Sequence, residues 1–177
     1  LVYTRLPDRF DLRVRADESQ SPRSLRLPMA PPSVSWPLLS PDGTALAVGI
    51  DTEQTVQQHP LQEPPVRTLV AVGQGWEPVA FVDQGRALII ARNKAGLRVL
   101  PLSDAPPPPI GFSADEIYAA VSPDGRWLAT ARIDSASRSV AAGVWVRPLS
   151  DPPEAAVSWI PNGMGRISWS ADSKYLA

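Results

Sequence analysis

The sequence contains no cysteine, a single histidine and no long apolar run, and each shortage excludes a class of protein. Without cysteine among its 177 residues, the chain can form neither a disulfide scaffold nor a thiolate metal site. Because His59 is the only imidazole, we expect no metal site built on histidines. No apolar stretch approaches the roughly 20 residues that a helix needs to cross a bilayer, so we expect no membrane insertion.

The chain also lacks an excess of charge of either sign. Its 17 basic and 18 acidic residues leave a net charge of −1. This balance gives no basic surface for a phosphate backbone, so a nucleic-acid partner is not expected. The 21 prolines and 11 glycines leave no convincing helical period over more than about ten residues, which predicts an all-β chain.

What the sequence does contain is one turn motif that occurs four times. The motif reads Ser-Pro-Asp-Gly where it is complete, and its copies begin at Ser40, Val82, Ser122 and Ser170. Serine can bond to nearby backbone, proline presets φ at about −65°, and glycine tolerates the left-handed conformation that closes a hairpin. The second copy departs from the motif, with Asp83 and Gln84 in the middle, and the fourth has Ser173 in place of glycine.

Each copy is followed by a leucine, and these leucines set the period of the repeat. They are Leu46, Leu88, Leu128 and Leu176. The last interval is the longest, and the polar segment 134–142 accounts for its extra length. Four short apolar segments follow one another in each repeat. They span 34–39, 45–50, 54–59 and 66–72, then 77–82, 87–92, 96–102 and a weak fourth at 110–112, then 117–121, 127–133, 143–149 and 155–160.

Four antiparallel strands in every unit of about 40 residues are typical of a β-propeller. The sequence therefore predicts an all-β propeller of four-stranded antiparallel blades, with three full blades and a partial blade at each end. A β-sandwich or an up-and-down barrel is the competing interpretation. Neither of these needs the same turn at the same place in a four-strand repeat.

The repeat also predicts the domain organisation. Residues 1–32 are expected to be the end of a preceding blade and a linker, and 33–75, 76–115 and 116–164 are expected to be blades. Residues 165–177 would begin a further blade, and all would belong to one incomplete propeller domain. Because the chain starts at Leu1 and stops within an expected strand, we expect it to be a fragment of a longer protein.

One segment of the third repeat resembles the blade motif of the WD40-like (PD40) repeat family: Ser122-Pro123-Asp124-Gly125-Arg126-Trp127-Leu128-Ala129. That propeller is found in TolB and in the N-terminal domains of prolyl oligopeptidase-type peptidases. Trp169, directly before Ser170, matches the tryptophan that the family prefers at this position. The resemblance implies a non-catalytic, TolB-like propeller scaffold for protein or peptide interaction, and a periplasmic or otherwise extracytoplasmic location.

The same resemblance leaves two other functions open. The chain could be the gating propeller of a prolyl oligopeptidase-type serine peptidase whose catalytic domain lies elsewhere. It could also be a sensor propeller attached to a bacterial signalling protein such as a protein kinase. No Gly-x-Ser-x-Gly nucleophile elbow is present, so no catalytic residue is predicted and the chain is not expected to be an enzyme by itself.

Other residues that invite a chemical role have a structural explanation. Asp42, Asp124 and Asp172 recur in the turn, where aspartate side chains accept hydrogen bonds from local backbone donors. His59 is expected to be an exposed strand residue. The sequence has neither a Ca²⁺-binding Asp-x-Asp-x-Asp-Gly loop nor a glycine-rich phosphate loop, so no metal and no cofactor are predicted.

The candidate binding residues lie at one end of the predicted blades. The resemblance implies that a protein or peptide partner would meet the loops that join second to third strands. Arg92 and Arg132 occupy equivalent positions there, and Asp134 and Arg138 belong to the enlarged loop beside Arg132. These four residues are the predicted binding site, and the sequence leaves the oligomeric state open.

Overall fold

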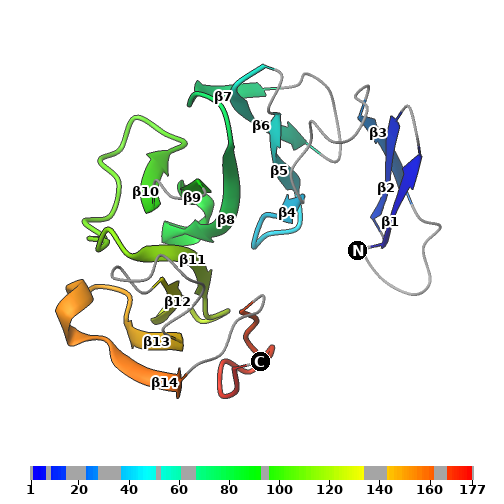
Figure 1. Cartoon of the computed structure of the whole chain (residues 1–177). Helices are drawn as coiled ribbons and strands as arrows, with labels where there is room; N and C mark the ends of the chain where they lie inside the picture. The colour runs from blue at the N-terminus through cyan, green and yellow to red at the C-terminus, as the bar shows by residue number, and fades with distance from the viewer. Residues whose placement is uncertain are drawn as a thin grey trace. The chain divides into compact units, whose positions relative to one another are not determined.

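The computed structural model describes residues 2–6, 9–14, 23–27, 37–50, 53–60, 67–92, 96–133, 143–161 and 167–176. The chain divides into two compact units, Leu1–Gly75 and Trp76–Ala177, and each is described by itself. Every sheet is antiparallel, and its strands pair in the order of the sequence (Figure 1). The predicted all-β class is confirmed.

The first unit contains a three-stranded and a four-stranded sheet. The three-stranded sheet consists of β1 (Val2–Leu6), β2 (Arg9–Val14) and β3 (Arg23–Leu27). The four-stranded sheet consists of β4 (Leu38–Leu39), β5 (Ala45–Ile50), β6 (Thr55–Pro60) and β7 (Arg67–Ala71). All six residues of β5 are buried, so both faces of this strand are covered. The predicted strand residues 34–36 lie outside the described part of the chain.

The second unit also contains a three-stranded and a four-stranded sheet. Its three-stranded sheet consists of β8 (Trp76–Val82), β9 (Ala87–Arg92) and β10 (Gly96–Pro101). The next has four strands, β11 (Glu116–Val121), β12 (Trp127–Arg132), β13 (Gly143–Pro148) and β14 (Val157–Pro161). Two short 3₁₀ turns, η1 (Asp83–Gly85) and η2 (Pro153–Ala155), and an isolated bridge between Trp169 and Leu176 complete the unit.

The weak fourth strand expected at 110–112 is not formed, and this prediction was wrong. Residues 106–109 are all proline and have no N–H to donate to a ladder. The N–H of Ile110 instead bonds back to the carbonyl of Pro108 at 2.8 Å. Ile110 and Phe112 pack against the hydrophobic core. The apolar side chains that suggested a strand therefore anchor the segment that connects β10 to β11.

The first, third and fourth copies of the repeated turn share one hydrogen-bond pattern. The hydroxyl of Ser40 donates to Oδ1 of Asp42 at 2.5 Å and accepts the N–H of Ala45 at 2.9 Å. Oδ1 of Asp42 also accepts the N–H of Thr44 at 3.1 Å. The turns at Ser122 and Ser170 repeat these bonds. In all three, the serine hydroxyl is the main reason why the pKa of the aspartate lies below its usual 3.8.

The second copy of the turn reaches the same reversal by another route. Asp83 and Gln84 have φ angles of 52° and 55°, and Gly85 follows at 88°. The ring of a proline locks φ at a negative value, so the first of these positions excludes proline. Arg86 supports the turn through an ion pair of 2.6 Å with Asp83. The departure from Ser-Pro-Asp-Gly in the sequence therefore marks a different backbone.

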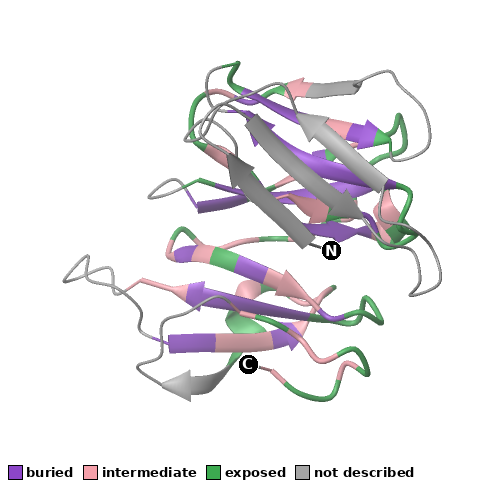
Figure 2. Cartoon of the chain, turned by 90° about the vertical axis from the view of Figure 1, so that its right-hand side faces the viewer, coloured by how far each residue is buried: buried purple, intermediate pink, exposed green. Residues whose placement is uncertain are grey.

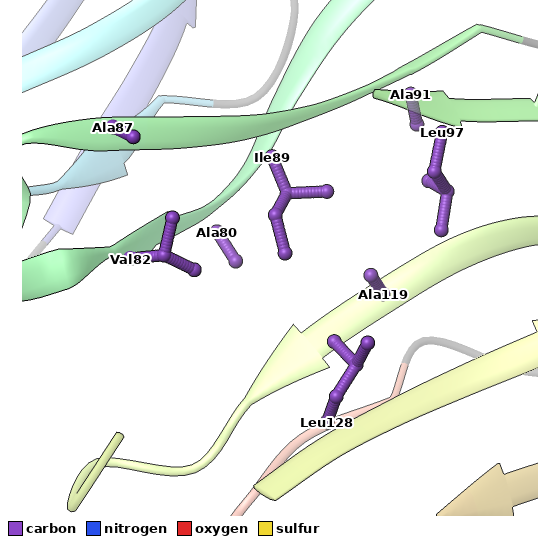
Figure 3. Packing of buried hydrophobic residues seen from close by; sticks show 8 residues of the cluster. All are labelled: Ala80, Val82, Ala87, Ile89, Ala91, Leu97, Ala119 and Leu128. Carbon is purple, nitrogen blue, oxygen red and sulfur yellow. The ribbon is translucent and has the colours of Figure 1, made fainter. Parts of the chain in front are cut away.

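The core of the second unit lies between its two sheets. Ala80, Val82 and Ile89 of the first sheet face Ala119 and Leu128 of the second (Figure 3). Ile89 and Leu128 are fully buried, and buried stretches run along the second strands of the sheets (Figure 2). Leu128 and its counterparts Leu46 and Leu88 are all inaccessible to solvent. The leucine that follows the turn is thus a core residue in the first three copies, whereas Leu176 after the fourth turn is half-buried.

Loss of the serine hydroxyl at a turn is expected to destabilise the fold. In Ser122→Ala, the N–H of Trp127 loses its acceptor and Asp124 loses a donor, at a cost of about 1–2 kcal/mol in the free energy of unfolding. Urea denaturation measures this change. Ser103→Ala, which removes an exposed hydroxyl, is the control, and equal effects of the two substitutions would contradict the role of the turn.

Candidate functional site

The structure describes two of the four predicted binding residues. Arg92 ends β9 and is exposed, while Arg132 ends β12 and is half-buried. Arg132 donates through Nη2 to the carbonyl of Pro153 at 2.9 Å, and its guanidinium lies 5.1 Å from the ring centroid of Trp145. Asp134 and Arg138 lie outside the described residues. Arg132 is therefore engaged within its own blade rather than presented freely at a rim.

A buried carboxylate explains the position of Arg132. Glu116 is inaccessible to solvent, and its Oε1 lies 3.4 Å from Nη2 of Arg132. The hydroxyl of Thr130 donates to the same oxygen at 2.8 Å, and the N–H of Ser113 donates to Oε2 at 2.9 Å. A buried charge costs several kcal/mol unless it is paired and hydrogen-bonded, and Glu116 is both. The group holds the start of β11 to β12.

Arg147 is a buried cation that the sequence interpretation missed. Its side chain lies in β13 and is only 1% exposed. Nη2 donates to the carbonyl of Gly111 at 2.5 Å, and Nη1 donates to the carbonyl of Asp151. Burial is the main influence on this guanidinium and lowers its pKa, while the charge of Glu116 opposes that shift. Arg147 joins two connecting segments.

The sequence held a signal for this residue. Arg147 directly precedes Pro148, as Leu100 precedes Pro101 and His59 precedes Pro60. In each case the proline ends the third strand and pairs with the first residue of the second strand. The position before this proline is one column of the aligned repeats. Since the aliphatic residue Leu100 occupies it in the second repeat, the column is a buried one. An arginine there predicts a buried cation with fixed acceptors.

The same column corrects the expectation for His59. We expected an exposed histidine, but it is only 4% exposed. Its place in β6 corresponds to that of Leu100, on a face turned to the interior. Among the described residues, Nε2 of His59 has no hydrogen-bond partner. Desolvation lowers the pKa of the imidazole below its ordinary 6.5, so the ring is held neutral.

A groove of about 260 Å³ lies beside the last described segment of the second unit. Two tryptophans and two aliphatic side chains form most of its wall, with one hydroxyl and one cation: Trp127, Val146, Trp169, Ser173, Lys174 and Leu176. Trp127 and Val146 come from β12 and β13, and the other four come from the turn that the Trp169–Leu176 bridge closes.

Hydrogen bonds hold the two walls of this groove together. Nε1 of Trp169 donates to the carbonyl of Ala120 at 3.1 Å. The N–H of Asp124 donates to Oγ of Ser173 at 3.1 Å, which ties one Ser-x-Asp turn to the next. Trp127 remains 40% exposed. The result is a rigid aromatic surface with room beside it.

One cation stands at the edge of this apolar groove. The side chain of Lys174 is largely exposed, and Nζ lies 4.0 Å from Oδ2 of Asp172. An exposed pair at this distance contributes little to stability, so the ammonium remains available to another anion. The sequence placed Trp127 and Trp169 beside the repeated turns but gave no sign that the space between them stays open.

The described residues offer neither a metal-binding cluster nor a membrane-spanning helix. No group of three or more His, Asp or Glu side chains in the described ranges is placed to hold a metal ion. In those same ranges no helix has the length and hydropathy needed to span a bilayer.

Comparison with known proteins identifies the fold but no family. The sequence matches no family model and no curated protein. Its structure resembles that of TolB from Acinetobacter baumannii, with a TM-score of 0.54 and 14% identity, over 98% of this chain and 56% of that one. It also resembles a protein from Bacteroides uniformis described as a putative 6-phosphogluconolactonase, with a TM-score of 0.52 and 15% identity, over 98% and 61%.

The first of these neighbours decides the architecture, because TolB is a β-propeller. The chain has a β-propeller fold. Its sheets are propeller blades, two of them with four strands, and the chain spans little more than half the length of either neighbour. At such low identity the likeness concerns the fold alone. The PD40 resemblance of the sequence goes beyond what these comparisons test.

Acidification is expected to destabilise the protein through His59 before it affects the turns. Because burial lowers the pKa of His59 in the folded state, the unfolded chain binds a proton first as the pH falls through 6.5. The free energy of unfolding should therefore decrease between pH 7.5 and 5. The aspartates of the turns have pKa values below 3.8, so their stabilising effect is lost only at more acidic pH.

Urea denaturation at several pH values tests this expectation. His59→Leu places the aliphatic residue of the second repeat in the column and should flatten the dependence between pH 7.5 and 5. The loss of stability at more acidic pH, which the aspartates of the turns cause, should remain in that variant. Equal slopes for the wild type and His59→Leu between pH 7.5 and 5 would show that another group titrates.

Proposed function

We propose that this chain acts as a non-catalytic propeller scaffold of the TolB/PD40 type, which presents a surface to a protein or peptide partner. The observation that carries the proposal is the groove between Trp127 and Trp169. Tryptophan is enriched at the centres of protein interfaces because it offers a large rigid contact area and loses little conformational entropy. A half-exposed tryptophan held beside an open apolar space provides such a centre.

The size of the groove favours a peptide side chain over a whole metabolite. Pockets for small molecules usually measure roughly 300–1,000 Å³. At about 260 Å³ and open to solvent, this groove accommodates one or two apolar side chains. Lys174 at its edge adds a preference for an acidic residue next to the inserted side chain. A peptide with an apolar residue followed by an acidic one fits this arrangement.

Three carboxylates of the second unit have structural partners. Asp124 and Asp172 accept the hydrogen bonds of their turns, and Glu116 is paired with Arg132. These carboxylates hold the backbone in place and are not aimed at the groove. This distribution supports a binding surface rather than a reaction centre, and it is why we propose that the chain has no catalytic activity by itself.

Selection from a phage-displayed peptide library over the whole chain tests the proposal. We expect the selected peptides to contain an apolar residue close to an acidic one. Trp127→Ala should weaken their binding at least tenfold, measured by calorimetry, because truncation of a central tryptophan commonly removes a large share of the binding free energy. Lys174→Gln should weaken the acidic peptides only.

Tyr175→Ala is the matched control. Tyr175 is an aromatic residue of the same turn, is 70% exposed and does not line the groove. Peptides that bind Trp127→Ala as well as they bind the wild type would contradict the assignment of the groove. Hydrolysis of 6-phosphogluconolactone by the purified chain would contradict the non-catalytic role.

A further inference from the structure

The outer edge of β10 differs from the corresponding edges of the other two described repeats. In the first unit the third strand β6 pairs with β7, with Val56 opposite Val70 and Gln58 opposite Arg67. In the last sheet β13 pairs with β14 in the same way, with Val144 opposite Ile160 and Val146 opposite Val157. Among the described residues β10 pairs only with β9, so its sheet ends after three strands (Figure 1).

The ladder between β9 and β10 shows which peptide groups point away from the sheet. The N–H of Leu102 donates to the carbonyl of Arg86, as the N–H of Leu149 donates to that of Arg126. Because inward and outward groups alternate along a strand, Leu97 and Val99 direct their N–H and C=O groups away from β9. Their counterparts are Val144 and Val146, which pair with a fourth strand.

The chain's own return segment does not occupy this edge. Residues 106–109 cannot donate hydrogen bonds, and residues 103–107 are exposed rather than packed on the strand. Further along, the carbonyl of Gly111 accepts from Arg147 of the next sheet at 2.5 Å. Ile110 and Phe112 contribute to the core. The segment is thus held against the neighbouring blade and leaves β10 without a fourth strand.

We propose that β10 binds an extended strand of a partner polypeptide, which completes this blade as its fourth strand. Strand addition to a free sheet edge is an established mode of peptide recognition, in which main-chain hydrogen bonds supply affinity and side chains supply specificity. The sister strands β7 and β14 have five residues each, which sets the length of the partner strand. Pro101 has no N–H and limits the ladder at that end.

The one charged side chain of β10 bears on the chemistry of the partner strand. Arg98 lies in the middle of β10, is exposed and stacks over Trp76 at 4.1 Å. Its counterparts in the sister blades, Gln57 and Trp145, stand opposite the small polar residues Thr68 and Ser158. An acidic residue opposite Arg98 forms the favourable cross-strand pair. The partner is therefore an antiparallel, proline-free strand with apolar residues around a central Asp or Glu.

Fluorescence polarisation with labelled peptides tests the proposal on the full chain. The probes are Arg-Glu-Leu-Val-Ala and Ala-Val-Glu-Trp-Ile, which copy 67–71 and 156–160 with Thr68→Glu or Ser158→Glu. We expect saturable binding that weakens at least fivefold when the glutamate reverts. N-methylation of the peptide amides that face β10 should abolish it, because the ladder then loses its donors. Failure of both glutamate peptides to bind at millimolar concentration overturns the proposal.

Variants of β10 locate the binding. Val99→Pro removes an outward N–H without breaking the ladder to β9, and should weaken the peptides at least tenfold. Val99→Thr keeps the N–H and should change binding less than twofold, and circular dichroism checks that both variants fold. Trp127→Ala should have no effect, so this result and the test of the tryptophan groove are independent. Equal peptide affinity of Val99→Pro and Val99→Thr would overturn the assignment.

Self-pairing of two β10 edges is the rival explanation of a free strand. Sedimentation of the chain over a range of concentrations distinguishes self-pairing from the binding of a partner strand. A dimer that Val99→Pro abolishes, and that excludes the peptides, would overturn the proposal of a partner strand. A species that stays at the same mass with and without bound peptide supports it.

Discussion

The hydrogen bond between a serine hydroxyl and the aspartate two residues later is the constraint on which the repeat depends. In the complete turns it fixes where the chain reverses, and the same hydroxyl also accepts the N–H that opens the next strand. The position of the reversal decides the register of the first two strands of a blade. Because a shift of one residue would exchange the two faces, the burial of Leu46 and Leu128 depends on this short polar contact.

The fold could be predicted from the sequence because each of its signals is local. The turns and the leucines after them are properties of a few consecutive residues. The predictions that failed concern positions whose structure depends on contacts with other strands. The segment at 110–112 has the composition of a strand, but the prolines before it and the hydrogen bond from Arg147 to the carbonyl of Gly111 direct it elsewhere. His59 looked polar and exposed, yet it stands where Leu100 stands in the next repeat.

The predicted site shows the same division between local and non-local information. The equivalence of Arg92 and Arg132 could be read from spacing, and the structure places both at the ends of second strands. That Arg132 pairs with Glu116 depends on residues far apart in the sequence. The groove depends on Trp169 lying next to Trp127 on a different strand. Differences between repeats at one aligned position, such as Leu100 against Arg147, are the feature of the sequence that indicates a buried cation.

The left-handed turn at Asp83 and Gln84 has a consequence for designs based on this repeat. A consensus sequence averaged over the copies would place proline at position 83, since two of the other three copies have it. In the first and third blades that residue rigidifies the hairpin, but here its ring would oppose the φ angle that the backbone has adopted. The turns are therefore interchangeable only as whole cassettes, and each cassette includes the residue that follows it, such as Arg86.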